Sequence, residues 1–214
     1  MAEKIGAFYK LLNTMEGKEY IETFLLYNVA LISAKVKPSI TLNLCKLNPK
    51  NVFNLWNKHG EEYLKTLNLD YIELRESNKS LIILIYDKNL LEKSIKDKAN
   101  QEFLLTIGYK NNLEVIEALE TLKSRYQEYN CPHELGVFLG YPIEDVKDFM
   151  NCASKKCLTC GYWKVYNSEQ KAKKVFQLFD SIKTFTAHNI IIGEKSSELA
   201  FILANNFKQV QIEV

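Results

Sequence analysis

The side chains best suited to chemistry gather between residues 131 and 166. This stretch holds four of the five cysteines of the chain, one of its three histidines and one of its two tryptophans. Thiolates and imidazoles are the ligands that zinc ions and iron–sulfur clusters take from proteins. Any site chemistry is therefore expected within this stretch.

Two different metal sites can be drawn from these residues. Cys152, Cys157 and Cys160 have the C-x4-C-x2-C spacing of plant-type iron–sulfur sites, with Cys131 upstream. A tetrahedral zinc site would instead take four ligands, namely Cys131, His133, Cys157 and Cys160. Against both sites, the chain has a single C-x2-C pair, and it leads into a predicted strand. The competing interpretation is that these cysteines are free thiols.

An enzymatic hypothesis rests on His133 and Glu134 as an acid–base pair, or on Cys160 as a thiol nucleophile. Adjacent residues on a helix point about 100° apart. His133 and Glu134 would therefore not easily share one substrate atom, and a capping role in a short helix over residues 133–140 is the competing interpretation.

The elements expected to position these side chains are short. Residues 133–139 can form a helix, Gly140 a left-handed turn, and Pro142 the start of a second helix with acidic residues in its first turn. Residues 161–166 alternate between two faces, which predicts a strand.

The rest of the chain predicts helices around a sheet. Helical spacing of apolar residues predicts two helices between residues 2 and 31, with a break at Gly17. Residues 39–47 have strand periodicity, and residues 71–75 and 81–86 flank a short loop, as in a hairpin. Because residues 81–86 are apolar on both faces, this strand is expected at the centre of a covered sheet. The predicted fold class is α/β, with α+β as the alternative: a mixed β-sheet covered by helices.

Two units are expected along the chain. The 214 residues, 47% of them hydrophobic, are enough to bury a substantial core. Residues 1–183 would form the main α/β domain. Residues 184–214 would form an extension packed on it, with a strand at 189–192, a helix at 196–205 and a strand at 210–214.

Charge and hydropathy limit the classes of partner. There are 28 Lys and Arg against 26 Asp and Glu, and residues 143–150 carry more acids than bases, which disfavours contact with nucleic-acid phosphates. The longest apolar run, residues 81–86, is far shorter than the roughly 20 residues that span a bilayer, and the N-terminal segment lacks signal-peptide features. An odd number of cysteines fits reduced thiols. The sequence predicts a soluble cytoplasmic protein that binds neither nucleic acid nor membrane.

A longer pattern runs through the same stretch. Residues 132–149 read PHE-x-G-x-FLGYP-x-EDV-x-x-F, and residues 160–166 read CGYWKVY. This pattern resembles the signature of the bacterial family called Domain of Unknown Function 3793, found mainly in anaerobes. The resemblance extends from about Tyr27 to Asp180.

The resemblance changes which residues are expected to form a site. Cys152 and Cys157 do not belong to the family pattern, which weakens both metal sites. Family members often carry a His-Cys pair near the start of the domain, where this chain has Asn28-Val29, followed by the retained Lys37. The resemblance favours a site built from His133, Glu134, Tyr141, Cys160, Trp163 and Lys164.

The family has no assigned activity, but its genes tend to lie near genes for ferrous iron uptake and flavodoxin. The resemblance therefore implies an accessory role in iron or redox homeostasis, with iron or zinc as the candidate cofactors. We expect a non-enzymatic binding protein with a protein or small-molecule partner and with ligand-binding residues His133, Tyr141, Trp163 and Lys164. The alternatives are the enzyme described above and an interaction module, which would expose an apolar patch of several hundred Å².

Overall fold

A three-stranded sheet lies at the centre of the protein, which we describe from a computed structural model covering residues 2–151 and 155–207. Its strands are β1 (Ser39–Cys45), β2 (Asp70–Glu76) and β3 (Ser80–Tyr86), in the order β1-β3-β2. Both pairings are antiparallel, so the sheet is not mixed as expected. The fold belongs to the mixed α+β class, the alternative of the two classes predicted. The predicted hairpin of β2 and β3 is confirmed.

The central strand β3 divides the core into two apolar clusters. Leu81, Ile83 and Ile85 point into one cluster, whereas Leu84 and Tyr86 point into the other. Successive side chains of a strand alternate between its faces, so a strand that is apolar throughout must be covered on both sides. This confirms the central position predicted for residues 81–86.

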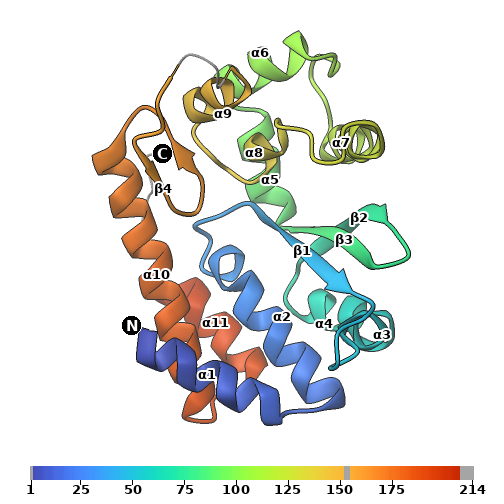
Figure 1. Cartoon of the computed structure of the whole chain (residues 1–214), viewed down its shortest axis with the longest axis vertical. Helices are drawn as coiled ribbons and strands as arrows, with labels where there is room; N and C mark the ends of the chain where they lie inside the picture. The colour runs from blue at the N-terminus through green and yellow to red at the C-terminus, as the bar shows by residue number, and fades with distance from the viewer. Residues whose placement is uncertain (1, 152–154, 208–214) are drawn as a thin grey trace.

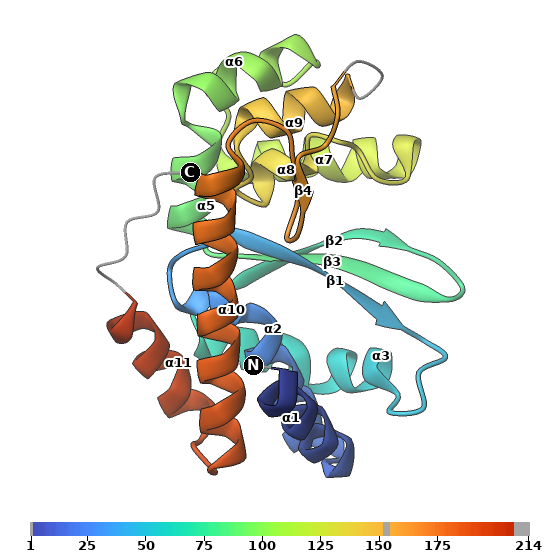
Figure 2. The ribbon, with the colours of Figure 1, turned by 60° about the vertical axis from the view of Figure 1, so that its left-hand side comes forward.

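The first cluster is covered by helices from both ends of the chain (Figures 1 and 2). They are α1 (Ala2–Thr14), α2 (Gly17–Ser33), α3 (Val52–Leu55), a π-helical turn (Trp56–Gly60), α4 (Glu61–Thr66), α10 (Glu169–Ile191) and α11 (Ser196–Asn206). The break expected at Gly17 is confirmed, because this residue has a φ of 54° between α1 and α2. Helix α10 runs along the side of the molecule and reaches from α1 to the hairpin labelled β4 (Figure 2).

The second cluster lies on the opposite face of the sheet, beneath helices from the middle of the chain (Figure 1). These are α5 (Lys88–Ile95), α6 (Lys98–Thr106), α7 (Val115–Tyr129), α8 (Leu135–Phe138) and α9 (Ile143–Met150). Two short strands, β4 (Thr159–Cys160) and β5 (Lys164–Val165), pair as a small hairpin between α9 and α10. The strand predicted over residues 161–166 is therefore limited to β5.

The C-terminal part differs from the expected strand-helix-strand extension. Residues 189–191 belong to α10, so the strand predicted at 189–192 is wrong. Thr186, Ala187 and Ile190 continue the buried stripe of α10, and the helix ends before Gly193, which has a φ of 91°. The boundary predicted at 183/184 thus falls inside a helix. Helix α11 confirms the helix predicted at 196–205, and the strand predicted at 210–214 lies outside the described residues.

None of the helices described for residues 2–151 and 155–207 is long and apolar enough to cross a membrane.

Candidate functional site

The corner between α8 and α9 is built from two glycines that leave no room for a side chain. A Cβ at Gly136 would lie 2.7 Å from Cγ2 of Val146, so α8 and α9 pack closely here. Gly140 has a φ of 71°, and a Cβ there would lie 2.6 Å from Cδ of Pro38. The left-handed turn predicted at Gly140 is confirmed, and Pro142 directly precedes α9.

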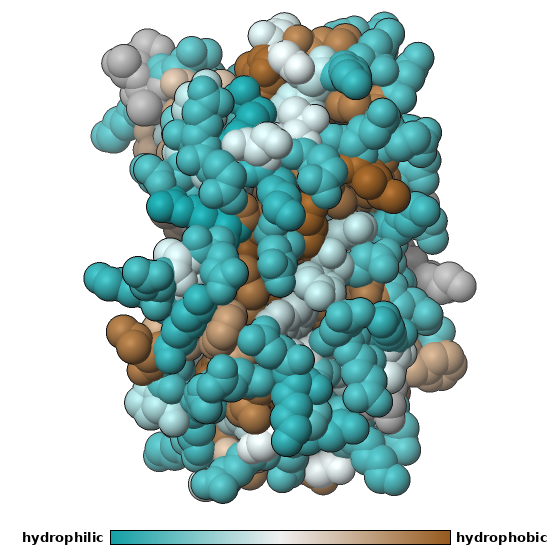
Figure 3. All heavy atoms as spheres, turned by 90° about the vertical axis from the view of Figure 1, so that its right-hand side faces the viewer, coloured by the Kyte–Doolittle hydropathy of each residue, from teal (hydrophilic) through white to brown (hydrophobic). Residues whose placement is uncertain are grey.

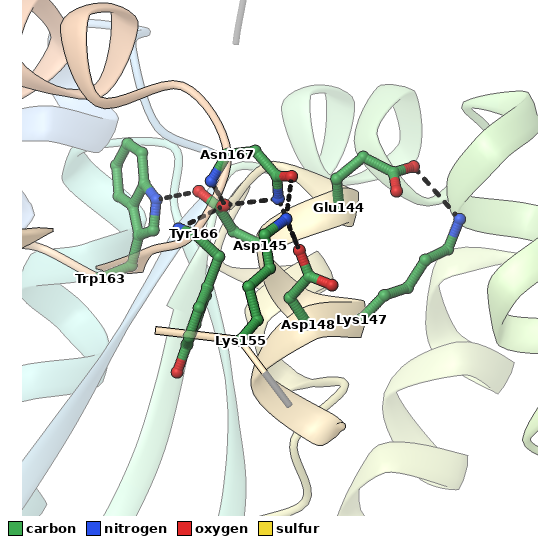
Figure 4. A network of polar contacts seen from close by, with 8 residues as sticks. All are labelled: Glu144, Asp145, Lys147, Asp148, Lys155, Trp163, Tyr166 and Asn167. Carbon is green, nitrogen blue, oxygen red and sulfur yellow. Dashed lines mark hydrogen bonds and ion pairs between the residues drawn. The ribbon is translucent and has the colours of Figure 1, made fainter. Parts of the chain in front are cut away.

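Asp145 fastens the β4–β5 hairpin to α9 (Figure 4). Its Oδ2 accepts a hydrogen bond from Trp163 Nε1 at 2.8 Å. Its Oδ1 accepts hydrogen bonds from Tyr166 N at 2.9 Å and from both the backbone and side-chain nitrogens of Asn167 at 3.0 Å. The carboxylate is buried, with 3% of the residue exposed. From the sequence, Asp145 was expected only as an acidic residue in the first turn of a helix, because its four donors lie about twenty residues away along the chain.

A second, exposed carboxylate extends this network (Figure 4). Asp148 Oδ2 accepts from Asn167 Nδ2 at 2.8 Å and pairs with Lys155 Nζ at 2.7 Å. Lys155 also donates to Asn167 Oδ1 at 2.6 Å. Hydrogen bonds to Asp145 and Asp148 therefore place Trp163 and Lys164 relative to α9.

A pocket of about 290 Å³ opens between α8, α9 and the hairpin. We call it the aromatic pocket. It is lined by Cys131, Pro132, His133, Leu135, Gly136, Leu139, Tyr141, Asp145, Val146, Phe149, Trp163 and Lys164. All four residues predicted to bind a ligand, His133, Tyr141, Trp163 and Lys164, lie in this lining.

Aromatic rings form the walls of this pocket. The rings of Tyr141 and Trp163 stack with centroids 5.4 Å apart and an interplanar angle of 29°. His133 meets Phe149 edge to face at 4.9 Å, and Lys164 Nζ lies 5.3 Å from the centroid of the Phe149 ring. Phe149 was not among the site residues expected from the sequence, although its helical spacing from Asp145 and Val146 places it on the same side of α9.

Glu134 lies apart from the aromatic pocket. Its carboxylate is buried, with 1% of the residue exposed, and it pairs with Arg125 Nε and accepts a hydrogen bond from Tyr109 at 3.4 Å. Burial and the Glu134 charge raise the pKa of Tyr109, and the hydrogen bond from Arg125 to Glu134 raises the pKa of Arg125. His133 is exposed and lines the pocket, so the structure separates the two members of the expected acid–base pair. Glu134 connects α7 to α8.

The described cysteines of the stretch 131–166 lie in two places, one in the pocket lining and the others in or beside β4. Cys131 lines the pocket and accepts a hydrogen bond from Tyr126 Oη at 3.7 Å. Cys157 Sγ lies 3.1 Å from the carbonyl oxygen of Thr159, and Cys160 is exposed in β4, outside the pocket lining. Cys152, required by the iron–sulfur spacing, lies outside the described residues.

Within residues 2–151 and 155–207, no group of three or more His, Cys, Asp or Glu side chains is arranged to hold a metal ion. The four zinc ligands expected from the sequence, Cys131, His133, Cys157 and Cys160, are therefore not brought together. The β4–β5 hairpin is hydrogen-bonded to α9 through Asp145. This bond places Trp163 of the hairpin, and not one of its cysteines, in the pocket lining.

A family model described as "Protein of unknown function (DUF3793)" matches residues 25–200. The chain belongs to this family. The match confirms the resemblance and continues past the expected end at Asp180, through α10 and into α11. No curated protein and no solved structure matches this chain.

In this DUF3793 protein, two lysines form a second polar region near the aromatic pocket. Lys37 Nζ donates to the carbonyl oxygen of Ser39 at 2.9 Å and lies 5.1 Å from the centroid of the Tyr141 ring. Lys183 Nζ donates to the carbonyl oxygens of Tyr27 and Asn28. We call Lys37 and Lys183 the lysine pair.

Burial dominates the acid–base behaviour of the lysine pair. It lowers the pKa of Lys37 to about 7, with a further contribution from the Lys183 charge, and it lowers the pKa of Lys183 to about 7. Among the described residues, neither ammonium group forms an ion pair with a carboxylate. The sequence pointed to Lys37 through the family pattern but gave no sign of Lys183, which reads as one more lysine of an amphipathic helix.

Proposed function

We propose that this protein binds a small, mainly apolar organic molecule in the aromatic pocket. The observation that carries the proposal is that His133, Tyr141, Trp163 and Lys164, from three separate segments, line one open pocket. Small-molecule sites are typically concave and apolar, with a few polar groups that orient the ligand. The pocket has this composition, and the bonds to Asp145 hold its walls in place before any ligand binds.

The positions of the acidic side chains favour binding over acid–base catalysis. The carboxylate of Glu134 is paired with Arg125, away from the pocket. Asp145 belongs to the lining, but its two oxygens accept four hydrogen bonds within the fold. A general base must reach the proton that it removes, and neither carboxylate is free to do so. His133 would therefore orient a ligand rather than act with a carboxylate partner.

The accessory role in iron or redox homeostasis remains part of the proposal, in the cytoplasm as the sequence predicts. It is supported by the family association described above. An apolar pocket walled by aromatic rings suits an organic molecule better than a bare metal ion, which prefers charged oxygen, nitrogen or sulfur ligands. We therefore propose an organic ligand for this role.

The interaction-module hypothesis has weaker support. Phe201 and Ile192 are 70% and 60% exposed, but single exposed apolar residues are normal on protein surfaces. On the face shown in Figure 3, hydrophilic side chains predominate and apolar ones form a narrow band. The aromatic pocket gives the more specific hypothesis.

Binding can be tested with N-phenyl-1-naphthylamine, a neutral fluorescent naphthalene. The chain has two tryptophans, so a Trp56→Phe variant leaves Trp163 as the reporter in the pocket wall. We expect saturable binding of one probe per chain, with energy transfer from Trp163. His133→Ala should weaken binding roughly fivefold by removing one aromatic wall, and His188→Ala, an exposed histidine on α10, should leave it unchanged.

Cys131 and Cys160, which are exposed among the described cysteines, provide an independent control. The probe should slow alkylation of Cys131, which lines the pocket, and leave that of Cys160 unchanged, as measured by peptide mass spectrometry. Absence of saturable binding, or equal protection of both thiols, would contradict the proposal.

A further inference from the structure

We infer that the ligand of the aromatic pocket carries an anionic group, such as a carboxylate, on a flat aromatic body. This inference rests on the proposed function and specifies the chemical class of the ligand. It follows from the polar groups that the fold has already paired and from Lys164, a cation of the described lining whose side chain has no ion-pair partner among the described residues.

The acidic side chains of the stretch 131–166 all have partners within the fold. Glu134 pairs with Arg125, Glu144 with Lys147, and Asp148 with Lys155. Asp145 accepts hydrogen bonds from Trp163, Tyr166 and Asn167. The pocket therefore offers a ligand no free carboxylate acceptor.

Hydrogen-bond donors, in contrast, remain available in the lining. The side chain of Lys164 is exposed, and its ammonium group forms no ion pair or hydrogen bond within the described part of the chain. The ring nitrogens of His133 have no hydrogen-bond partner there either. The Lys164 ammonium lies 5.3 Å from the Phe149 ring, so its charge is held at the pocket wall. A pocket with free donors and filled acceptors is complementary to a ligand that supplies acceptors, and an ionised acid forms the strongest such hydrogen bonds.

A cationic ligand is the main competitor, because aromatic walls also bind ammonium groups through their ring faces. Here Lys164 already places a positive charge over the Phe149 ring. A second cation would be repelled by it and would find no free carboxylate. The charge distribution therefore selects an anion.

The size and shape of the pocket restrict the body of the ligand. A volume of about 290 Å³ is at the lower end of the range for small-molecule sites. The rings of Tyr141 and Trp163 in the lining stack on each other, and aromatic side chains of this kind favour contact with an aromatic ligand. A bicyclic aromatic acid has suitable dimensions and charge.

Two fluorescent probes with the same aromatic skeleton but different charge distinguish the effect of ligand charge on affinity from the effect of apolar contact. They are the neutral N-phenyl-1-naphthylamine and the anionic 8-anilinonaphthalene-1-sulfonate. We expect the anion to bind roughly fivefold to tenfold more tightly than the neutral probe at low salt, and this advantage should decrease at high salt. Lys164→Met should weaken binding of the anionic probe by a similar factor and change the affinity of the neutral probe less than twofold.

Lys156→Met is the matched control, because Lys156 is an exposed lysine of the same segment that does not line the pocket. Its affinities for both probes should equal those of the wild-type protein. Equal wild-type affinity for the two probes, or a Lys164→Met variant that affects neither, would overturn the anion inference while leaving the proposed function intact. Tighter binding of 2-naphthylmethylammonium than of the sulfonate would also overturn it. Failure of every probe to bind at this site would remove both proposals.

Discussion

The aromatic pocket and the lysine pair both contact Tyr141, but their buried charged groups have different kinds of partner. Around the pocket, Asp145 and Glu134 are buried with several donors each. In the lysine pair, Lys37 and Lys183 donate to backbone carbonyls and have no described carboxylate partner. Tyr141 belongs to both regions, because its ring lines the pocket and faces Lys37.

This difference has consequences for stability. A buried carboxylate with four donors is stable when ionised, and it becomes costly only when a partner is removed. A buried ammonium group without a counter-ion is disfavoured when charged, so it releases its proton at a lower pH. We therefore expect the pocket region to depend on its hydrogen-bond partners and the lysine pair to depend on pH.

Asp145→Ala should cause the largest loss of stability, about 3–5 kcal/mol, because it leaves four buried or partly buried donors without an acceptor. Asp145→Asn, which retains an oxygen acceptor, should cost less and keep the protein folded. Urea unfolding would measure both values. Asp148→Ala is the control, since its carboxylate is more exposed than that of Asp145 and its loss should destabilise the protein much less. Equal losses at positions 145 and 148 would show that burial of Asp145 has no special importance.

Because of the lysine pair, we expect the free energy of unfolding to increase between pH 7 and about pH 9.5. In this range the unfolded chain keeps protons on both lysines, because their ordinary pKa is about 10.5, whereas the folded protein has lost them near pH 7. The unfolded state binds more protons, so the free energy of unfolding rises with pH, by roughly 3 kcal/mol over this range for one lysine.

Lys37→Met and Lys183→Met should each flatten this increase, and Lys174→Met, an exposed lysine of α10, should not. Urea unfolding at pH 7, 8 and 9 would measure the slope. The range ends near pH 9.5 because buried tyrosines act in the opposite direction above pH 10. Burial raises the pKa of Tyr63, Tyr109 and Tyr162, so their contribution to stability is lost at higher pH. If the free energy of unfolding of the wild-type protein did not change between pH 7 and 9, the lowered pKa values of the two lysines would be contradicted.

Glu134→Gln should have a smaller effect, a loss of about 1–2 kcal/mol, because it removes the ion pair with Arg125 but keeps a hydrogen-bonding group. Binding of the neutral naphthalene probe should change less than twofold, since Glu134 does not line the pocket. A double-mutant cycle with Arg125→Met would isolate the pairwise energy. Loss of probe binding without loss of stability would instead assign Glu134 to the pocket.

Much of the fold follows from local patterns. The apolar run of β3 required cover on both faces. The break at Gly17, the hairpin of β2 and β3 and the turn at Gly140 could each be predicted from a few adjacent residues. The strand predicted at 189–192 failed for a physical reason. A short apolar run has no periodicity that distinguishes strand from helix, and here the buried stripe of α10 continues through it.

The sequence by itself determined which side chains could form a site. His133, Tyr141, Trp163 and Lys164 belong to the pattern that resembles the family, and the structure places all four in one pocket. Only the tertiary structure decided how their neighbours act. It paired Glu134 with Arg125, gave Asp145 its four donors and brought Lys37 near Lys183 from segments almost 150 positions apart in sequence. A residue's charge and size are local properties, but its solvation and its partners depend on what packs against it, which is fixed only when the chain folds.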